Sequence, residues 1–300
     1  VNRGLEFDLS YKALDLSKVK LNLRANAGLY RNEITQMALD PATGKPKYYE
    51  EQGAFAYKKG HSVQDYYMPI YAGITSTGLP QWEYYYTEDA SGKKTAIQDL
   101  ENWLQVSSND SRSLKQGTTT DYNNATKQFV GKSAIPDLVG GFGFDLTVHG
   151  VTLSSAFSFG LGGYGYDGAY ATLMNPSSAI GSSNWHKDIL DSWSPTNTNG
   201  SLPILGSNAS ELSQATSRST RFLTSRSYLN LSNVRISYDL PKSLVKHVGL
   251  ERASVYVSGD NLFLISARKG FVSMSSSSGS SSSNRYLPMS TITAGVQIKL

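Results

Sequence analysis

A run of alternating apolar and polar residues at positions 19–30 constrains this chain more than any other feature. Val19, Leu21 and Leu23 open the run, Leu29 closes its apolar set, and the intervening positions are polar or glycine. A period of two is the pattern of a β-strand whose two faces meet different surroundings. The run is about twice the usual strand length of roughly 5–6 residues and matches the roughly 9–11 residues of a tilted transmembrane strand. We therefore expect a strand that crosses a bilayer.

Further stretches show the same alternation, most cleanly at the C-terminal end, where Ile292, Val296 and Leu300 belong to one apolar row. The predicted strands lie at about 3–11, 18–30, 137–148, 150–162, 226–240, 252–265 and 286–300. Between Leu231 and Val234 the apolar face changes parity, which predicts a β-bulge near Asn233. These stretches together predict an antiparallel all-β sheet.

The connections between the predicted strands alternate in length. Short turns join the first to the second strand, the third to the fourth and the fifth to the sixth, whereas long connections span about 31–136, 163–225 and 266–285. Short turns at one end and long loops at the other are typical of outer-membrane barrels, whose short turns are periplasmic. The sequence therefore predicts a transmembrane antiparallel β-barrel segment with long extracellular loops.

Smaller elements are expected within these connections. Tyr66–Tyr71 and Trp82–Tyr86 flank a turn at Thr75–Pro80, which predicts a β-hairpin in the first long loop. His149-Gly150 is expected to form the tight turn between the third and fourth strands. We expect one helical turn at 241–251.

Composition excludes several classes of function. The chain has 28 Lys and Arg against 24 Asp and Glu, and no block of like charge forms a stripe that would indicate nucleic-acid binding. Cysteine is absent, which excludes disulfides and thiolate metal sites. No stretch has the pattern of a signal peptide. The first residues already lie in a strand pattern, so we expect the natural chain to continue upstream.

Several blocks of this sequence follow the pattern of one known family. They are NRGLEFDLSY (2–11), HSVQDYYMPIYAG (61–73), GITSTGLPQWEY (73–84), the hairpin region at 133–163, NWHKDILDSWSPTNTNGSLP (184–203), YLNLSNVRISYDLP (228–241), VYVSGDNLF (255–263) and KGF (269–271). In this order they resemble the C-terminal part of the barrel in SusC/RagA-family TonB-dependent outer-membrane transporters. The sequence departs from that pattern at Val272 and Ser273, which replace an acidic-proline step, and at Leu300, where many barrels end in an aromatic residue.

The resemblance implies that residues 1–300 form about the last seven strands of a 22-stranded barrel. It implies import of nutrient oligomers, most often oligosaccharides and sometimes oligopeptides, across the outer membrane of a Gram-negative, Bacteroidetes-type bacterium. The expected partners are a SusD-like surface lipoprotein, outer-membrane lipid and TonB. In the family, TonB binds through an N-terminal segment outside this chain, and the plug domain also lies outside it. No catalysis and no cofactor are expected. A passive porin-like channel and a soluble β-rich glycan-binding module remain as alternative interpretations.

Motifs that suggest other chemistry are weak. Gly160–Gly165 fits G-x-G-x-x-G, but neither an amphipathic helix nor a parallel-strand context follows it, so we expect the glycines to end a strand and begin a loop. The four histidines lack the spacing of metal ligands, and no catalytic constellation is recognisable. We expect Asp260 to face the barrel lumen and Asn261 to help end its strand.

Aromatic residues in the long connections are the best candidates for contact with a ligand or partner, because their faces stack on sugar rings or pack against a protein. These candidates are Trp82, Tyr84, Tyr85, Trp103, Tyr164, Tyr166, Trp185 and Trp193. We expect Trp82 and its tyrosines to form one patch with Trp185 and Trp193. The alternative is that these residues pack the loops together or lie in the interfacial girdle. The serine tract Ser273–Ser283 is expected to be a polar, flexible loop.

Overall fold

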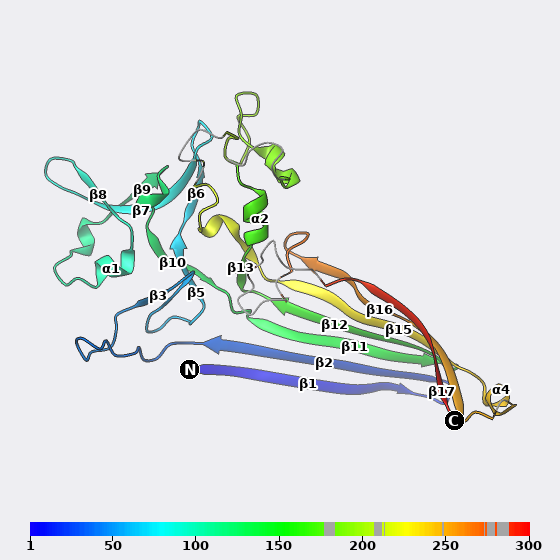
Figure 1. Ribbon diagram of the computed structural model, residues 1–300. Helices are drawn as coiled ribbons and strands as arrows, with labels where there is room; N and C mark the ends of the chain where they lie inside the picture. Colours follow the sequence, from blue (N-terminus) through cyan, green and yellow to red (C-terminus); the bar gives the residue numbers. More distant parts are fainter. Residues whose placement is uncertain are drawn as a thin grey trace.

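A computed structural model of the chain describes residues 1–176, 184–206, 212, 214–247, 249–272, 274, 280 and 288–300. Seven long strands form one antiparallel sheet in the order β1-β2-β11-β12-β15-β16-β17 (Figure 1). They are β1 (Asn2–Asp15), β2 (Val19–Asn32), β11 (Leu138–Val148), β12 (Val151–Leu161), β15 (Tyr228–Asp239), β16 (Arg252–Ser266) and β17 (Thr291–Lys299). The predicted all-β architecture and its long strands are confirmed. The described part of the serine tract is too small to test the prediction made for it.

Each strand of this sheet, which we call the wall, separates apolar from polar residues. Register places apolar residues side by side from strand to strand, as in the row Leu9, Ala25, Phe142, Phe157, Leu231 and Phe263. The opposite face of the sheet carries polar rows, such as Lys12, Asn22, Asp145, Ser154, Arg235, Ser258 and Thr293. The apolar rows remain exposed, with Leu5 and Val296 each at 63%. Over the described residues, the wall therefore has a predominantly apolar face that is largely exposed.

Local geometry within the wall follows from particular residues. His149 and Gly150 have φ values of 49° and 89°, as both central residues of a type I′ hairpin turn require, which confirms the predicted turn. The register shift between Leu231 and Asn233 confirms the predicted bulge. The prediction that Asn261 helps end its strand is wrong, because β16 continues to Ser266. Asn261 instead takes a φ of 51° inside the strand, where a bulge accommodates the left-handed backbone.

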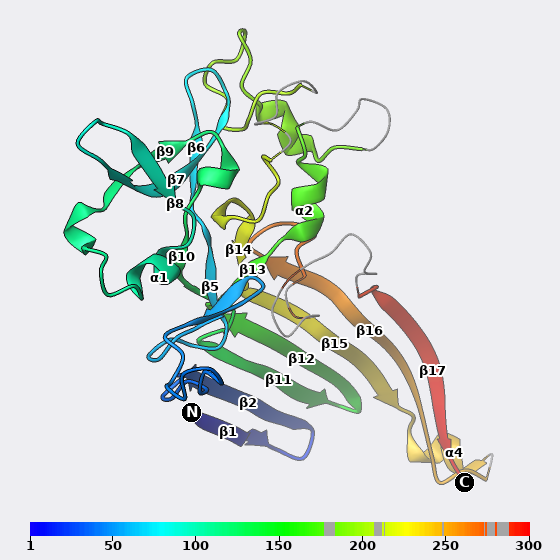
Figure 2. The ribbon, with the colours of Figure 1, turned by 60° about the vertical axis from the view of Figure 1, so that its left-hand side comes forward.

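The long connections lie together at one end of the wall, and the helix α4 (Lys242–His247) lies with the C-terminus at the other end (Figures 1 and 2). The helix confirms the helical turn expected at 241–251. Gly162 and Gly163, both with positive φ, follow the end of β12, which confirms that these glycines end a strand and begin a loop. No helix in the described ranges is both long and apolar enough to span a membrane.

The connections have their own secondary structure. The first contains β3 (Glu50–Gln52), β4 (Phe55–Tyr57), β5 (Asp65–Pro69), β6 (Tyr71–Ile74), β7 (Pro80–Glu88), β8 (Lys94–Ile97), α1 (Leu100–Leu104), β9 (Lys115–Thr119), β10 (Lys127–Ser133) and the 3-10 turns η1 (Ser111–Ser113) and η2 (Tyr122–Asn124). The second contains β13 (Tyr164–Tyr166), α2 (Gly168–Leu173), η3 (Lys187–Asp191), η4 (Thr220–Phe222) and β14 (Leu223–Ser225). Among the described residues, most buried apolar side chains lie here rather than in the wall, including Met68, Trp82, Met174 and Phe222. We call this body the loop assembly.

Candidate functional site in the loop assembly

Two small sheets organise the first connection. One has the order β10-β5-β4-β3, and in the other β7 pairs with β6, β8 and β9. The pairing of β6 with β7 confirms the predicted hairpin around Thr75–Pro80. Tyr66 lies in β5, which pairs with β4 and β10, so the first arm of the hairpin is shorter than predicted.

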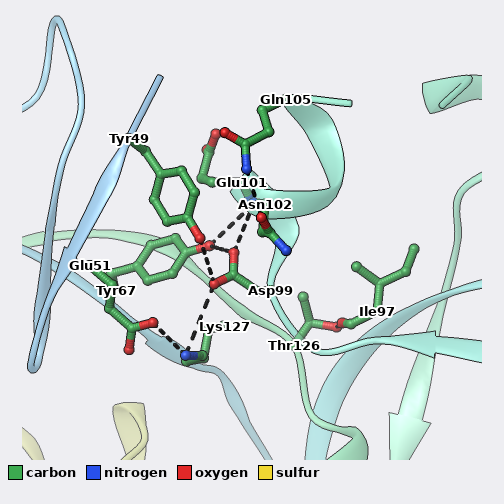
Figure 3. Close-up of polar contacts among 10 residues, drawn as sticks. All are labelled: Tyr49, Glu51, Tyr67, Ile97, Asp99, Glu101, Asn102, Gln105, Thr126 and Lys127. Carbon is green, nitrogen blue, oxygen red and sulfur yellow. Dashed lines mark hydrogen bonds and ion pairs between the residues drawn. The ribbon is translucent and has the colours of Figure 1, made fainter. Parts of the chain in front are cut away.

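Asp99 links the two small sheets (Figure 3). Its carboxylate caps α1 by accepting from the backbone N–H of Asn102 at 2.9 Å, and it accepts from the Tyr67 hydroxyl at 2.7 Å and the Tyr49 hydroxyl at 2.9 Å. Burial raises the pKa of Tyr67 far above its usual range, and burial followed by the Asp99 carboxylate does the same for the pKa of Tyr49. Both phenols therefore stay protonated and serve as donors.

Ion pairs surround this carboxylate. Lys127 Nζ lies 2.5 Å from Glu51 Oε2 and 4.0 Å from Asp99 Oδ2 (Figure 3). Lys58 Nζ lies 2.7 Å from Oε2 of Glu101, a residue that is only 6% exposed. Because buried charges are stable only when paired, the network fixes α1 against β5 and β10.

Removal of one hydroxyl tests this network. Tyr67→Phe deletes the donor to Asp99 and the acceptor for the Glu101 backbone N–H, which lies 3.1 Å away. A hydrogen bond to a charged group contributes about 1.5–3 kcal/mol, so we expect the first connection to lose about that much stability. Amide hydrogen exchange across α1 and β5 measures the loss. Tyr48→Phe is the control, since within the described residues the exposed Tyr48 hydroxyl has a single hydrogen-bond partner, Lys58 at 3.3 Å, and protection should then be unchanged.

A column of arginine and aromatic side chains joins all three long connections. The Tyr71 and Trp82 ring centroids are 6.3 Å apart, and the Arg221 guanidinium lies 5.3 Å from the Tyr71 centroid and 4.9 Å from that of Phe222. Phe222 then contacts Tyr170, with centroids 6.2 Å apart. We call this series, which Arg268 completes, the arginine–aromatic column.

Arg268 ties the third connection to the second. Its guanidinium lies 4.3 Å from the Tyr170 ring centroid, and its Nε donates to Asp167 Oδ2 at 2.9 Å. Asp167 is fully buried, and its other oxygen accepts from the Tyr170 backbone N–H at 3.1 Å to cap α2. The Tyr170 hydroxyl donates to Asp188 at 2.8 Å. These contacts hold α2 to the residues that follow β16.

The polar face of the wall carries its own cross-strand pairs. Arg24 on β2 lies 3.2 Å from Asp145 on β11, and Asn233 on β15 donates to Asp260 on β16 at 2.7 Å. The Arg235 guanidinium lies 4.0 Å from the ring centroid of Tyr256. The polar face therefore presents charged and amide groups in ordered rows, as the water-facing side of a barrel requires.

Comparisons with known proteins match this architecture. No family model matches the sequence. TonB-dependent receptor P3 of Formosa agariphila is 23% identical over 268 residues, which cover 87% of this chain and 24% of that protein. TonB-dependent receptor P26 of the same organism is 28% identical over 132 residues, which cover 44% of this chain and 13% of that protein. The chain thus spans about a quarter or less of the length of these relatives.

Solved structures share the fold. The RagAB peptide transporter superposes with a TM-score of 0.72 at 23% identity, over 99% of this chain and 29% of that chain. The RagAB peptide importer in its open-open state gives a TM-score of 0.70 at 22% identity. In sequence the chain is similar to TonB-dependent receptors, and its fold matches a part of the RagAB transporter. The named relatives are receptors, and the solved structures are of a transporter.

One of the predicted contact residues lies inside the loop assembly, and three others are half-buried in it. Trp82 is fully buried between Tyr71 and Tyr122. Its predicted place in an exposed aromatic patch is therefore wrong, because loop packing covers the ring. Trp185 is half-buried and donates its Nε1–H to the Asn175 carbonyl at 3.1 Å. The other two, Tyr166 and Trp193, are half-buried, Tyr166 against Phe222 and Trp193 against Gly78.

The other four candidates are half-buried as well. Tyr84 stacks on Tyr86 with centroids 5.0 Å apart, Tyr85 pairs through its backbone with β8 and β9, and Trp103 lies on α1. Tyr164 lies under the Lys132 ammonium, which is 4.4 Å from its ring centroid. Like Tyr166, Trp185 and Trp193, these four keep part of their surface exposed, so contact with a ligand or partner stays a prediction for all seven.

Asp167, Arg221 and Arg268 are not among the residues predicted from the sequence. The KGF block lies directly after Arg268, but nothing in the local pattern shows that its partner is 101 residues away. Only the folded loop assembly brings the three connections together.

Proposed function

We propose that the complete receptor imports nutrient oligomers across a Bacteroidetes-type outer membrane, with energy from TonB, and that this chain supplies wall and loops. The observation that supports this proposal is the seven-stranded wall, in which the strand register aligns apolar residues on one face and polar residues on the other. The polar face would line the lumen, and the loop assembly would lie outside the cell. The relationship to TonB-dependent receptors supports active rather than passive transport.

A SusD-like lipoprotein is the proposed partner of the loop assembly. A specific interface buries about 1,200 Å² or more, and the short turns at the other end of the wall are too small to supply it. The described loop surface offers exposed apolar side chains, among them Leu190 at 84% exposure on η3 and Leu39 at 58%. The proposed cargo is a glycan or a peptide, the latter suggested by the likeness to a peptide transporter.

Uptake in whole cells tests the transport proposal. Cells that produce the full-length receptor should accumulate the cognate labelled oligomer, and a protonophore or loss of TonB should abolish accumulation. A porin-like channel would instead continue to equilibrate the oligomer across the outer membrane without energy. Equal uptake with and without TonB would therefore contradict the proposal.

Tyr84 offers a sharper test of ligand or partner contact. Tyr84→Ala removes a partly exposed ring from the stacked pair with Tyr86, and we expect uptake to fall several-fold, because aromatic faces contribute strongly to recognition. Tyr84→Phe keeps the ring and should retain uptake. Heat-modifiable gel mobility reports assembly of the barrel, which should be normal in both variants. Unchanged uptake in Tyr84→Ala would show that the ring only packs loops.

A further inference from the structure

Two arginines interrupt the apolar face of the wall. Following the strand register across the described positions of all seven strands, the residues on this face are apolar, small or uncharged except for Arg3 on β1 and Arg31 on β2. Along β1, the residues on the same face as Arg3 are Leu5, Phe7 and Leu9. A guanidinium on such a face does not contribute to apolar packing, so its role has to be inferred from the groups around it.

The register places Arg3 and Arg31 directly opposite each other. Side chains at such positions have Cβ atoms about 4.5–5.5 Å apart, and like charges there destabilise the pair of strands. Both residues are exposed. Within the described residues neither side chain makes an ion pair or a hydrogen bond, so no protein anion relieves the repulsion there.

The other arginines of the wall are partnered. Arg24 pairs with Asp145 at 3.2 Å, Arg252 pairs with Asp239 at 2.7 Å, and Arg235 lies over the Tyr256 ring. The contrast shows that this chain ordinarily supplies a partner for a wall arginine. At Arg3 and Arg31 the partner must come from elsewhere.

The two arginines lie at the end of the wall that carries the loop assembly. β1 begins at Asn2 and β2 ends at Asn32, next to the first long connection (Figure 1). On the lipid face of a barrel a charge is costly at the midplane and nearly neutral close to the interface. The position therefore corresponds to the level of lipid headgroups. A guanidinium binds phosphate in a bidentate manner, and two facing guanidinium groups can hold one phosphate between them.

We propose that Arg3 and Arg31 form a binding site for the phosphate group of an anionic lipid in the outer leaflet. The proposal rests on the proposed placement of the loop assembly outside the cell. The phosphate neutralises the facing charges, and the acyl chains of the same lipid lie along the apolar rows below. The site holds the receptor at a fixed depth in the membrane.

Lipid retention on the purified full-length receptor tests the site. The probes are a bis-phosphorylated lipid A and its dephosphorylated form, each added to receptor in neutral detergent and counted by native mass spectrometry. We expect the phosphorylated lipid to be retained at least five-fold better than the dephosphorylated one. The variant R3Q/R31Q should remove this preference. Millimolar inorganic phosphate should not displace the lipid, which separates a lipid headgroup from free phosphate as ligand.

The control variant K242Q/K246Q removes two exposed positive charges from α4, at the opposite end of the wall, and should keep the preference. If R3Q/R31Q fails to assemble, R3K/R31K keeps the charge but loses bidentate geometry, and an intermediate preference is expected. Equal retention by wild type and R3Q/R31Q would overturn the proposal and would indicate a carboxylate on a strand beside β1 as the partner. Failure to retain either lipid on any variant would instead contradict the lipid-facing role of the apolar rows, and with it the proposed placement.

Discussion

Replacement of Arg268 by alanine is expected to loosen the loop assembly while the wall stays intact. Arg268 pairs with the fully buried carboxylate of Asp167 and covers the ring of Tyr170. Breaking a buried ion pair costs about 3–5 kcal/mol, because the remaining charge loses compensation in a poorly solvated site. The Arg268 side chain keeps 22% exposure, so we expect a value near 3 kcal/mol, the lower end of that range. The residues affected should be α2 and those that follow β16.

Amide hydrogen exchange on the full-length receptor measures this loss, with α2 expected to lose protection and β11 and β12 to keep theirs. Arg112→Ala is the matched control. Arg112 also pairs with an aspartate, Asp110 at 2.8 Å, but its side chain is 88% exposed, and exposed pairs contribute about 0–1 kcal/mol. Equal effects of the two substitutions would show that the Arg268 pair is no more than a surface contact.

The wall could be predicted from sequence because its signal is local. Alternation along a strand assigns each residue to one of two faces, and short turns such as His149-Gly150 set the register between neighbours. The parity change after Leu231 was enough to predict the bulge that the structure shows. The predicted strand ends agree with those of the structure within a few residues for the same reason. Asn261 was wrongly predicted to end its strand, because a bulge inside β16 has the same sequence pattern as a strand end.

The loop assembly could not be predicted in this way, because its contacts join residues that are far apart in the chain. Trp82 was a candidate for ligand or partner contact, with loop packing as the alternative, and it packs against Tyr122 and Tyr71 from separate segments. Asp167 and Arg268 share no local pattern. An aromatic residue in a loop has the same sequence signature whether it faces a ligand or fills the loop interior, and only burial separates the two.

Arginine at position 296 is expected to destabilise the wall strongly, whereas lysine at position 293 is expected to be mild. Val296 on β17 is 63% exposed and lies beside Val255 in an apolar row. Thr293 lies on the other face, beside Ser258. A charge on the lipid face costs about 2–4 kcal/mol at the midplane and about 0–1 kcal/mol near an interface, while substitutions on the lumen face leave stability largely unchanged. The two substitutions together therefore test which face of the wall contacts lipid.

The full-length receptor, refolded into vesicles, provides the measurement through urea titration followed by heat-modifiable gel mobility. Val296→Arg should lower the free energy of unfolding by 2–4 kcal/mol if it lies near the midplane, and Thr293→Lys by less than about 1 kcal/mol. Leu23→Arg on β2, which four strands separate from β17, repeats the test in a row whose neighbours are Tyr11 and Phe144. A reversed order, with Thr293→Lys the more damaging change, would mean that the apolar rows face the interior. The polar rows, which include Arg24 and Arg235, would then face lipid, although charged groups in hydrocarbon are costly.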